Sequence, residues 1–285
     1  MLRRLLQRLR GGQSVELPGY TALGVIRRGS MSVIFRGRDR KTDRIVAVKI
    51  HKPEARKAVE RLESRYRDFT EGQITAAFDH PNIVKCFGCG DLGGNHYLVL
   101  EYLEGVPLAS LMAGKSKRLQ GARLRLLHQS AAALAHVHAK RFVHQDFCPK
   151  NLLVINGNLV KLIDFGLAIP LLDKPIVRSR VGTAEILAPE LLRREPCDQR
   201  IDIFAWGVVA YELLCGQWPF ESPEHHQGLN RVLNVTPVPL GRRVPGLPEE
   251  VANLVMRCLV KEPDRRLRSM NTAVGVVERH LDAGV

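Results

Sequence analysis

Hydrophobic positions in the first third of the chain follow the pattern of short β-strands. Runs rich in β-branched residues, separated by polar turns, predict strands at 20–26, 32–40 and 45–50. Pro53 then opens a charged segment that predicts one helix continuing to about Ala77. The segment HPNIV (80–84) ends this helix. Two further strands are predicted near 83–88 and 97–102.

The pattern becomes helical from about residue 120. Residues 120–140 are rich in Ala and Leu, which predicts a helix. Residues 202–215 are apolar on nearly every side, as in a helix buried in a core. Loops rich in Pro separate the later helices. The pattern therefore predicts an α+β chain with a small sheet part, a larger helical part and a boundary near 101–107.

Composition is ordinary for a globular protein, with 285 residues, 45% hydrophobic and 25% charged. Without a run of about 18 apolar residues or a secretory signal, and with six scattered cysteines, a cytoplasmic location is expected. The net charge is +14, and ten of these charges lie within 1–71. This excess favours an anionic membrane or an acidic or phosphorylated ligand, unless it only keeps the surface soluble; nucleic acid is disfavoured because no nucleic-acid motif is visible.

The first ten residues, MLRRLLQRLR, place Leu on one helical face and Arg on the other. This pattern predicts a short basic amphipathic helix, ended by Gly11 and Gly12. Such a helix suits peripheral contact with an anionic membrane, packing against the rest of the chain, or contact with a partner protein.

Four short motifs follow one another in a fixed order. AVK ends at Lys49, HQDFCPKN spans 144–151, DFG spans 164–166 and APE spans 188–190. Each motif alone is weak, but together and in this order the chain resembles the protein kinase superfamily over about 20–281. The resemblance implies a two-lobed α+β kinase fold. Its parts would be an N-terminal extension at 1–13, then a kinase domain at 14–281 made of an N-lobe (14–101), a hinge (101–107) and a C-lobe (108–281).

The resemblance also implies ATP and Mg²⁺, because phosphoryl transfer depends on positioning and charge neutralisation. Lys49 would hold the α- and β-phosphates, and Glu71 would fix the lysine side chain. Asp146 would accept or orient the proton of the substrate hydroxyl. Asn151 and Asp164 would bind Mg²⁺ through hard oxygen ligands.

The adenine would lie at the link between the lobes, where backbone groups of Glu101 and Leu103 would pair with it. Apolar neighbours would sandwich the ring, although they could equally be plain core. The further nucleotide-binding residues implied by the resemblance are Ile26, Gly29, Val33, Ala47 and Leu153.

The glycine-rich loop departs from the family pattern. Residues 26–34, IRRGSMSVI, stand where the family has G-x-G-x-x-G-x-V, so that Arg27 and Ser32 replace two glycines and Gly29 remains. Glycine lets backbone amides approach phosphates closely, so the cradle is expected to be weaker. Arg27 either adds positive charge near the nucleotide or faces solvent.

The catalytic loop departs as well. Gln145 replaces the arginine of the family's HRD motif, and Cys148 stands where Ser/Thr kinases carry a lysine. Lys150 either replaces that cation or points to solvent. His144 is interpreted as a core histidine, and the Cys86–Cys89 spacing as part of a buried strand, since no second cysteine pair suggests a metal.

Features after the DFG motif separate the possible functions. Thr183 lies before the APE motif at the spacing of Ser/Thr protein kinases, and a Glu190–Arg266 ion pair and a helix-anchoring Asp202 are expected. The prediction is an ATP- and Mg²⁺-dependent kinase acting on Ser or Thr of protein substrates. The alternative is a pseudokinase that serves as an ATP-binding scaffold or regulator; a small-molecule kinase is disfavoured by Glu190, Asp202 and Arg266.

Overall fold

The structure is a computed structural model that divides the chain into two compact units. It describes residues 15–52, 69–92, 94–171, 183, 186–220 and 227–282. The first unit holds the described residues up to Asp79 together with Val84–Glu104, and the second holds His80–Ile83 and the residues from Gly105 onward. The predicted extension at 1–13 and its amphipathic helix lie outside the described residues.

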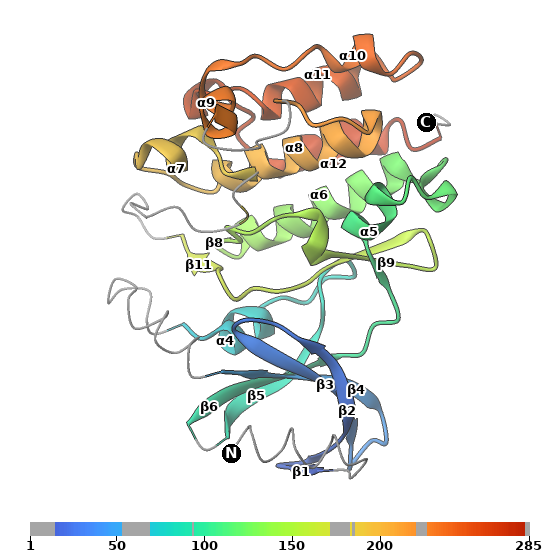
Figure 1. Ribbon diagram of the computed structural model, residues 1–285, viewed down its shortest axis with the longest axis vertical. Helices are drawn as coiled ribbons and strands as arrows, with labels where there is room; N and C mark the ends of the chain where they lie inside the picture. The colour runs from blue at the N-terminus through green and yellow to red at the C-terminus, as the bar shows by residue number, and fades with distance from the viewer. Residues whose placement is uncertain are drawn as a thin grey trace. The chain divides into compact units, whose positions relative to one another are not determined.

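The first unit is built on one six-stranded sheet with the order β1-β2-β3-β4-β6-β5, in which all neighbours are antiparallel (Figure 1). The three strands predicted at 20–50 and the one predicted near 97–102 are confirmed to within two residues, whereas the strand predicted near 83–88 lies three to four residues later. The strands are β1 Val15–Leu17, β2 Tyr20–Arg28, β3 Ser32–Asp39, β4 Ile45–His51, β5 Cys86–Leu92 and β6 Asn95–Glu101.

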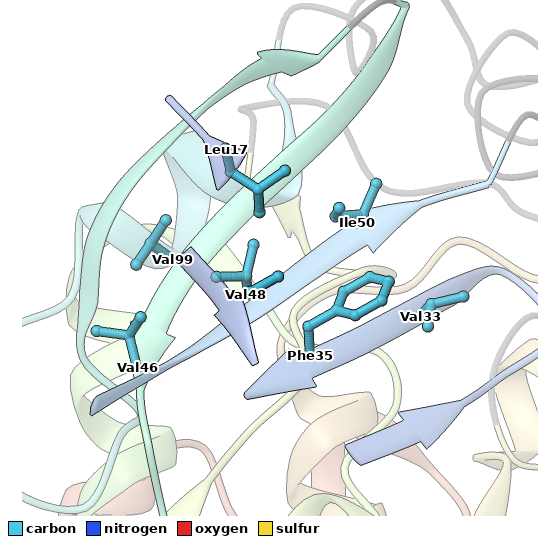
Figure 2. Packing of buried hydrophobic residues seen from close by; sticks show 8 residues of the cluster. Leu17, Val33, Phe35, Val46, Val48, Ile50 and Val99 are labelled. Atoms are coloured by element: carbon cyan, nitrogen blue, oxygen red, sulfur yellow. The ribbon is translucent and has the colours of Figure 1, made fainter. Parts of the chain in front are cut away.

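Alternation along these strands divides the sheet into two faces. Side chains from β1, β2, β3, β4 and β6 form a buried apolar cluster on one face (Figure 2). In β4 this face takes Val46, Val48 and Ile50, so Ala47 and Lys49 project to the other face. The cluster consists of Leu17, Ala22, Val33, Phe35, Val46, Val48, Ile50 and Val99.

Helix α4 (Glu71–Ala76) begins at a capping box. The backbone of Thr70 is extended, with φ −80° and ψ 155°, and its Oγ1 accepts a 3.3 Å hydrogen bond from the Gln73 N–H. The prediction of one helix from Pro53 to Ala77 is therefore wrong at Thr70, because an N-cap residue starts a new helix. Residues 53–68 lie outside the described part of the chain.

The second unit is mainly helical, and its longest described helices are α6 (Arg123–Ala139) and α8 (Arg200–Cys215). Thirteen of the sixteen residues of α8 are buried, which confirms the prediction of a central helix. No helix within the described ranges has the length and apolar character needed to cross a membrane. The other helices are α5 Leu108–Ala113, η1 Lys117–Leu119, η2 Pro149–Asn151, α7 Pro189–Arg193, α9 Gln227–Asn234, α10 Leu240–Arg243, α11 Glu249–Cys258, η4 Pro263–Arg265 and α12 Met270–Glu278.

Two small sheets accompany these helices, with the orders β10-β9-β7 and β11-β8. The hairpin of β9 and β10 directly follows the HQDFCPKN motif, and the DFG motif directly follows β10. The predicted catalytic loop therefore lies between β8, which ends just before it, and β9, which begins just after it. Their bounds are β7 Val106–Pro107, β8 Phe142–Val143, β9 Leu152–Ile155, β10 Leu159–Leu162 and β11 Ile169–Pro170.

Candidate active-site residues

A buried ion pair joins the sheet of the first unit to helix α4. The Lys49 ammonium Nζ lies 2.7 Å from Glu71 Oε1, and the exposed fractions of these residues are only 6% and 9%. Glu71 is the first residue of α4, where the helix dipole favours a carboxylate. The predicted Lys49–Glu71 pair is confirmed.

His51 is a further partner of Glu71 that the sequence reasoning missed. Its Nε2 lies 2.8 Å from Glu71 Oε2, so Lys49 and His51 each contact one carboxylate oxygen. The signal was the two-residue spacing in β4, because residues i and i+2 of a strand share a face. The two contacts together hold the carboxylate in one orientation.

Strand register separates the predicted apolar contacts. Ala47 lies on the face of Lys49, whereas Val33 pairs with Ile50 and belongs to the apolar cluster on the opposite face. The residue that pairs with Lys49 is Ile34. Val33 therefore does not share the face of Ala47, because a shift of one residue along a strand reverses the face, and Ile34 is the β3 residue on the face of Lys49.

The turn between β2 and β3 is closed by its own backbone. The Gly29 N–H donates to Ser32 O at 2.9 Å, and Lys52 Nζ donates to Gly29 O at 2.6 Å. Ile26, which stands at a register irregularity of β2, is 47% exposed. The amide of Gly29 is thus occupied in this turn.

The end of β6 is tied to Lys85, just before β5. The Glu101 N–H donates to Lys85 O at 2.9 Å, while Glu101 Oε1 accepts from the Lys85 N–H at 2.7 Å. No hydrogen bond among the described residues uses the backbone N–H of Leu103. The Arg36 guanidinium lies over the intervening Tyr102 ring, 5.5 Å from its centroid.

In the second unit, both carboxylate oxygens of Asp146 accept hydrogen bonds. Asn151 Nδ2 donates to Oδ2 at 2.9 Å, and the Thr183 N–H and Oγ1 donate to Oδ1 at 2.9 and 2.8 Å. Asn151 Nδ2 also donates to the Asp146 carbonyl at 2.9 Å. The structure therefore brings three predicted residues together and gives the Asp146 carboxylate a defined orientation.

Asp202 of α8 anchors the backbone just before Asp146. Its two carboxylate oxygens accept from the N–H groups of His144 and Gln145 at 2.8 and 2.9 Å. The second contact helps Gln145 hold a left-handed backbone, with φ +66°. This anchoring role of Asp202 is confirmed.

His138 of α6 is a second partner of Asp202 that sequence reasoning missed. Its Nε2 lies 2.9 Å from Asp202 Oδ2. Burial acts to raise the pKa of Asp202, but the contacts with His138 and the loop amides outweigh it and hold that pKa below its ordinary value. Asp202 is therefore ionised, and a neighbouring helix satisfies its charge.

His144 is fully buried against aromatic rings. Its ring centroid lies 4.9 Å from that of Phe165, edge on, and its Nδ1 accepts from the Asp146 N–H at 3.2 Å. Burial lowers the pKa of His144, which favours the neutral imidazole despite the nearby carboxylates. The interpretation as a core histidine is confirmed.

The DFG motif and Asn151 present the oxygen donors that suit Mg²⁺. Asp164 has a left-handed backbone, with φ +67°, and its Oδ1 accepts from the Gly166 N–H at 3.2 Å. The Ile163 N–H donates to Asn151 O at 2.9 Å and ties the two segments together. Since Asn151 Nδ2 serves Asp146, its amide Oδ1 is the atom left to face a cation. A carboxylate and an amide oxygen fit Mg²⁺.

The remaining catalytic-loop positions differ in exposure. Cys148 is buried, and burial together with the Asp146 charge raises the pKa of its thiol. Lys150 in η2 is exposed, and no ion pair among the described residues includes it. Leu153 of β9 is half-buried and pairs with Lys161 and Pro107.

Glu190 and Arg266 form the predicted buried ion pair. Arg266 Nη1 and Nη2 donate to the two oxygens of Glu190 at 2.6 and 2.9 Å. The guanidinium also donates to the carbonyls of Arg200, Val260 and Lys261. The APE motif is thus attached to the end of the helical core.

Cys86 and Cys89 stand in β5, and Cys89 is exposed rather than buried. Its Cβ would lie 2.4 Å from a Cβ added to Gly72, so only glycine lets α4 approach β5 this closely. No group of three or more potential metal-binding side chains occurs in the described segments. The cysteine spacing therefore belongs to helix–sheet packing.

The two units together carry the features of a protein kinase domain, and the model of that family matches residues 20–275. The chain belongs to the protein kinase domain family. It is 29% identical over 266 residues to the serine/threonine-protein kinase PrkC of Bacillus subtilis strain 168, covering 93% of this chain and 41% of that protein. It is 32% identical over 250 residues to the serine/threonine-protein kinase PknB of Mycolicibacterium smegmatis, covering 85% and 39%. The chain thus spans about two fifths of the length of these relatives.

Proposed function

We propose that this protein transfers the γ-phosphate of ATP to Ser or Thr hydroxyls of protein substrates in the presence of Mg²⁺. The observation that carries the proposal is the buried ion pair in which Lys49 Nζ lies 2.7 Å from Glu71 Oε1. Family membership and the names of the relatives support the same reaction. Removing two charges from water is costly, so a functional demand for an oriented ammonium explains the pair.

Each unit supplies one part of the proposed chemistry. Lys49 binds the α- and β-phosphates through an ammonium that Glu71 orients. Asn151 and Asp164 hold Mg²⁺, which neutralises phosphate charge when it is bound. Both residues offer oxygen atoms from backbone segments that hydrogen bonds fix.

Asp146 orients the acceptor hydroxyl and takes its proton. The contact of Asn151 Nδ2 with Oδ2 and the contacts of Thr183 with Oδ1 set the plane of the carboxylate. A carboxylate already held in place loses little freedom when the substrate binds, and such positioning lowers the barrier to transfer.

Nucleotide recognition is proposed to use Ala47 and Ile34 on the sheet, the backbones of Glu101 and Leu103, and Leu153. Ile26 and Gly29 complete the predicted set. A cytoplasmic location and contact of residues 1–10 with an anionic membrane or a partner stay predictions.

The test is a transfer assay with the full chain, labelled ATP, Mg²⁺ and generic basic proteins. Asp146→Asn and Asp164→Ala are expected to abolish transfer, as is EDTA, while the exposed Asp282→Ala serves as the matched control and keeps wild-type activity. Transfer that persists in Asp164→Ala or in EDTA contradicts the proposal. ATP binding without transfer by the wild type would identify the chain as a pseudokinase.

A further inference from the structure

Arg27 lies in the same cross-strand row as Lys49. Arg27 of β2 pairs with Ile34 of β3, which pairs with Lys49 of β4. Directly paired residues of antiparallel strands project to the same face of a sheet. Since neighbouring strands are about 4.8 Å apart, the Cα atoms of Arg27 and Lys49 are separated by roughly 10 Å. Two long cationic side chains on one face at this spacing can contact one chain of phosphates.

The Arg27 guanidinium is available for such a contact. Arg27 is exposed, and no hydrogen bond or ion pair within the described ranges uses its side chain. Other arginines of this sheet are engaged: Arg36 lies over the Tyr102 ring and Arg38 Nη1 lies 3.0 Å from Asp43 Oδ1. Arg27, on the face of Lys49, therefore differs from Arg36 and Arg38, whose guanidinium groups already have partners within the fold.

The neighbouring Arg28 provides an internal comparison. It is equally exposed and likewise has no partner among the described residues, but it pairs with Val33 on the face of the apolar cluster. The two arginines therefore share charge, exposure and strand, and differ in the face to which they project. Any effect of general positive charge would be common to both.

The turn that follows has its Gly29 amide already engaged and lacks two of the family's glycines. The Gly29 N–H already donates to Ser32 O at 2.9 Å, and the positions of Arg27 and Ser32 carry side chains that glycine would lack. Backbone amides that cradle phosphates need close approach without such side chains. A phosphate site built here would therefore gain from another source of positive charge.

We propose that the Arg27 guanidinium binds the phosphates of the nucleotide and compensates for the altered glycine positions and the engaged Gly29 amide of this turn. The inference rests on the proposed nucleotide-binding function and deepens it. A guanidinium forms paired, charge-assisted hydrogen bonds with phosphate oxygens, so the loss of one such contact weakens binding roughly tenfold or more. Adenosine carries no phosphate and gains nothing from Arg27.

The experiment measures binding of Mg²⁺-ATP and of adenosine to the full chain by titration calorimetry. Arg27→Ala and the similarly sized Arg27→Gln are expected to raise the Kd for ATP about tenfold and to leave the Kd for adenosine within about twofold. Arg28→Ala is expected to match the wild type for both ligands, and Arg27→Lys to recover part of the ATP affinity. Thermal melts verify that each variant is folded.

The outcomes separate this inference from the proposed function. If the wild type binds ATP and both Arg27→Ala and Arg27→Gln bind it equally well, the role of Arg27 is overturned while nucleotide binding stands. An equal loss in Arg28→Ala would also overturn it, because general charge would then explain the effect. If the wild type binds neither ATP nor adenosine, the proposed function fails and the inference falls with it.

Discussion

The two units position their chemical groups in different ways. In the first unit, Lys49 and its neighbours stand on regular strands, where pairing decides the face of every side chain. In the second unit, Asp146 and Asp164 stand on irregular backbone, and individual hydrogen bonds hold each of them. A shift of one residue therefore reverses a role in the first unit, whereas loss of one anchoring group disturbs several backbone positions in the second.

Backbone strain shows what the anchors of the second unit must offset. Gln145 and Asp164 adopt φ values of +66° and +67°, a region that costs a non-glycine residue about 1–2 kcal/mol. Asp202 offsets this near Gln145 through carboxylate–amide hydrogen bonds, which are stronger than neutral ones. The first unit has no comparable strain at Lys49, which lies inside a strand.

The largest expected effect concerns Arg266, the most highly connected cation of the second unit. Arg266→Met leaves Glu190 buried without its partner and is expected to lower the free energy of unfolding by about 3–5 kcal/mol. Chemical unfolding followed by circular dichroism measures the change. The exposed neighbour Arg265→Met is the matched control and should change stability by less than about 0.5 kcal/mol. A loss below about 1 kcal/mol in Arg266→Met would contradict the anchoring role.

The next effect concerns the cation of the catalytic loop. Cys148 is buried with a raised thiol pKa, so it stays neutral and cannot stabilise the transferred phosphoryl group. Lys150→Ala is therefore expected to lower kcat roughly tenfold to a thousandfold, with a smaller change in KM for ATP. Steady-state kinetics measures both parameters.

Cys148→Ala is the mild control for that prediction, because it removes a neutral group. The double variant Cys148→Lys/Lys150→Ala should recover activity by moving the charge two residues. Wild-type kcat in Lys150→Ala, under conditions where Asp146→Asn is inactive, would show that another group supplies the cation.

A smaller pair of effects distinguishes the two faces of β3. Val33 is 1% exposed within the apolar cluster, so Val33→Ala should lower the free energy of unfolding by about 1–2 kcal/mol. Ile34→Ala should destabilise the fold less, because the side chain is half-exposed, but should raise the KM for ATP. Unfolding curves and kinetics on both variants measure the contrast; the reverse assignment of the two effects would contradict the register argument.

The sequence predicted different features in the two units, because regular strands have a periodic pattern and irregular backbone has none. Alternation predicted the strands of the first unit, but the face of Val33 depended on a register that the broken glycine pattern left ambiguous by one residue. The same alternation places His51 on the face of Lys49, but a strand pattern does not indicate which carboxylate of another element, here Glu71, a side chain contacts.

In the second unit the motifs predicted Asp146, Asn151 and Asp164, whose irregular backbone has no periodicity to read. The His138–Asp202 contact joins residues 64 positions apart on different helices, and no local pattern predicts it. The T-x-x-Q capping box at 70–73 is a sequence signal for the start of α4. The prediction missed it because the charged pattern of 53–77 indicated one continuous helix. Long-range partners, in contrast, require the fold itself.

Two lysines with buried Nζ atoms, one in each unit, give the finest comparison. Lys49 has the Glu71 carboxylate, whereas Lys261 Nζ is buried with no hydrogen-bond partner among the described residues and lies 3.4 Å from the Phe220 ring centroid. Burial, with a contribution from the nearby Arg266 charge, lowers the pKa of Lys261 to about 7. The amine is therefore largely neutral above pH 7 in the folded chain and charged in the unfolded chain up to about pH 10.

Between these two pH values the unfolded chain binds more protons, so the free energy of unfolding should rise with pH because of Lys261. Lys261→Met keeps most of the length of the side chain and removes the titratable amine. It should flatten this rise and increase stability by about 1 kcal/mol near pH 7, where the wild-type amine still takes up a proton without a polar partner. Unfolding curves of both chains at pH 6.5, 8 and 9.5 would measure the slope. An unchanged slope in Lys261→Met would contradict the lowered pKa, and a large loss of stability would show that the ammonium over the Phe220 ring is itself a favourable contact.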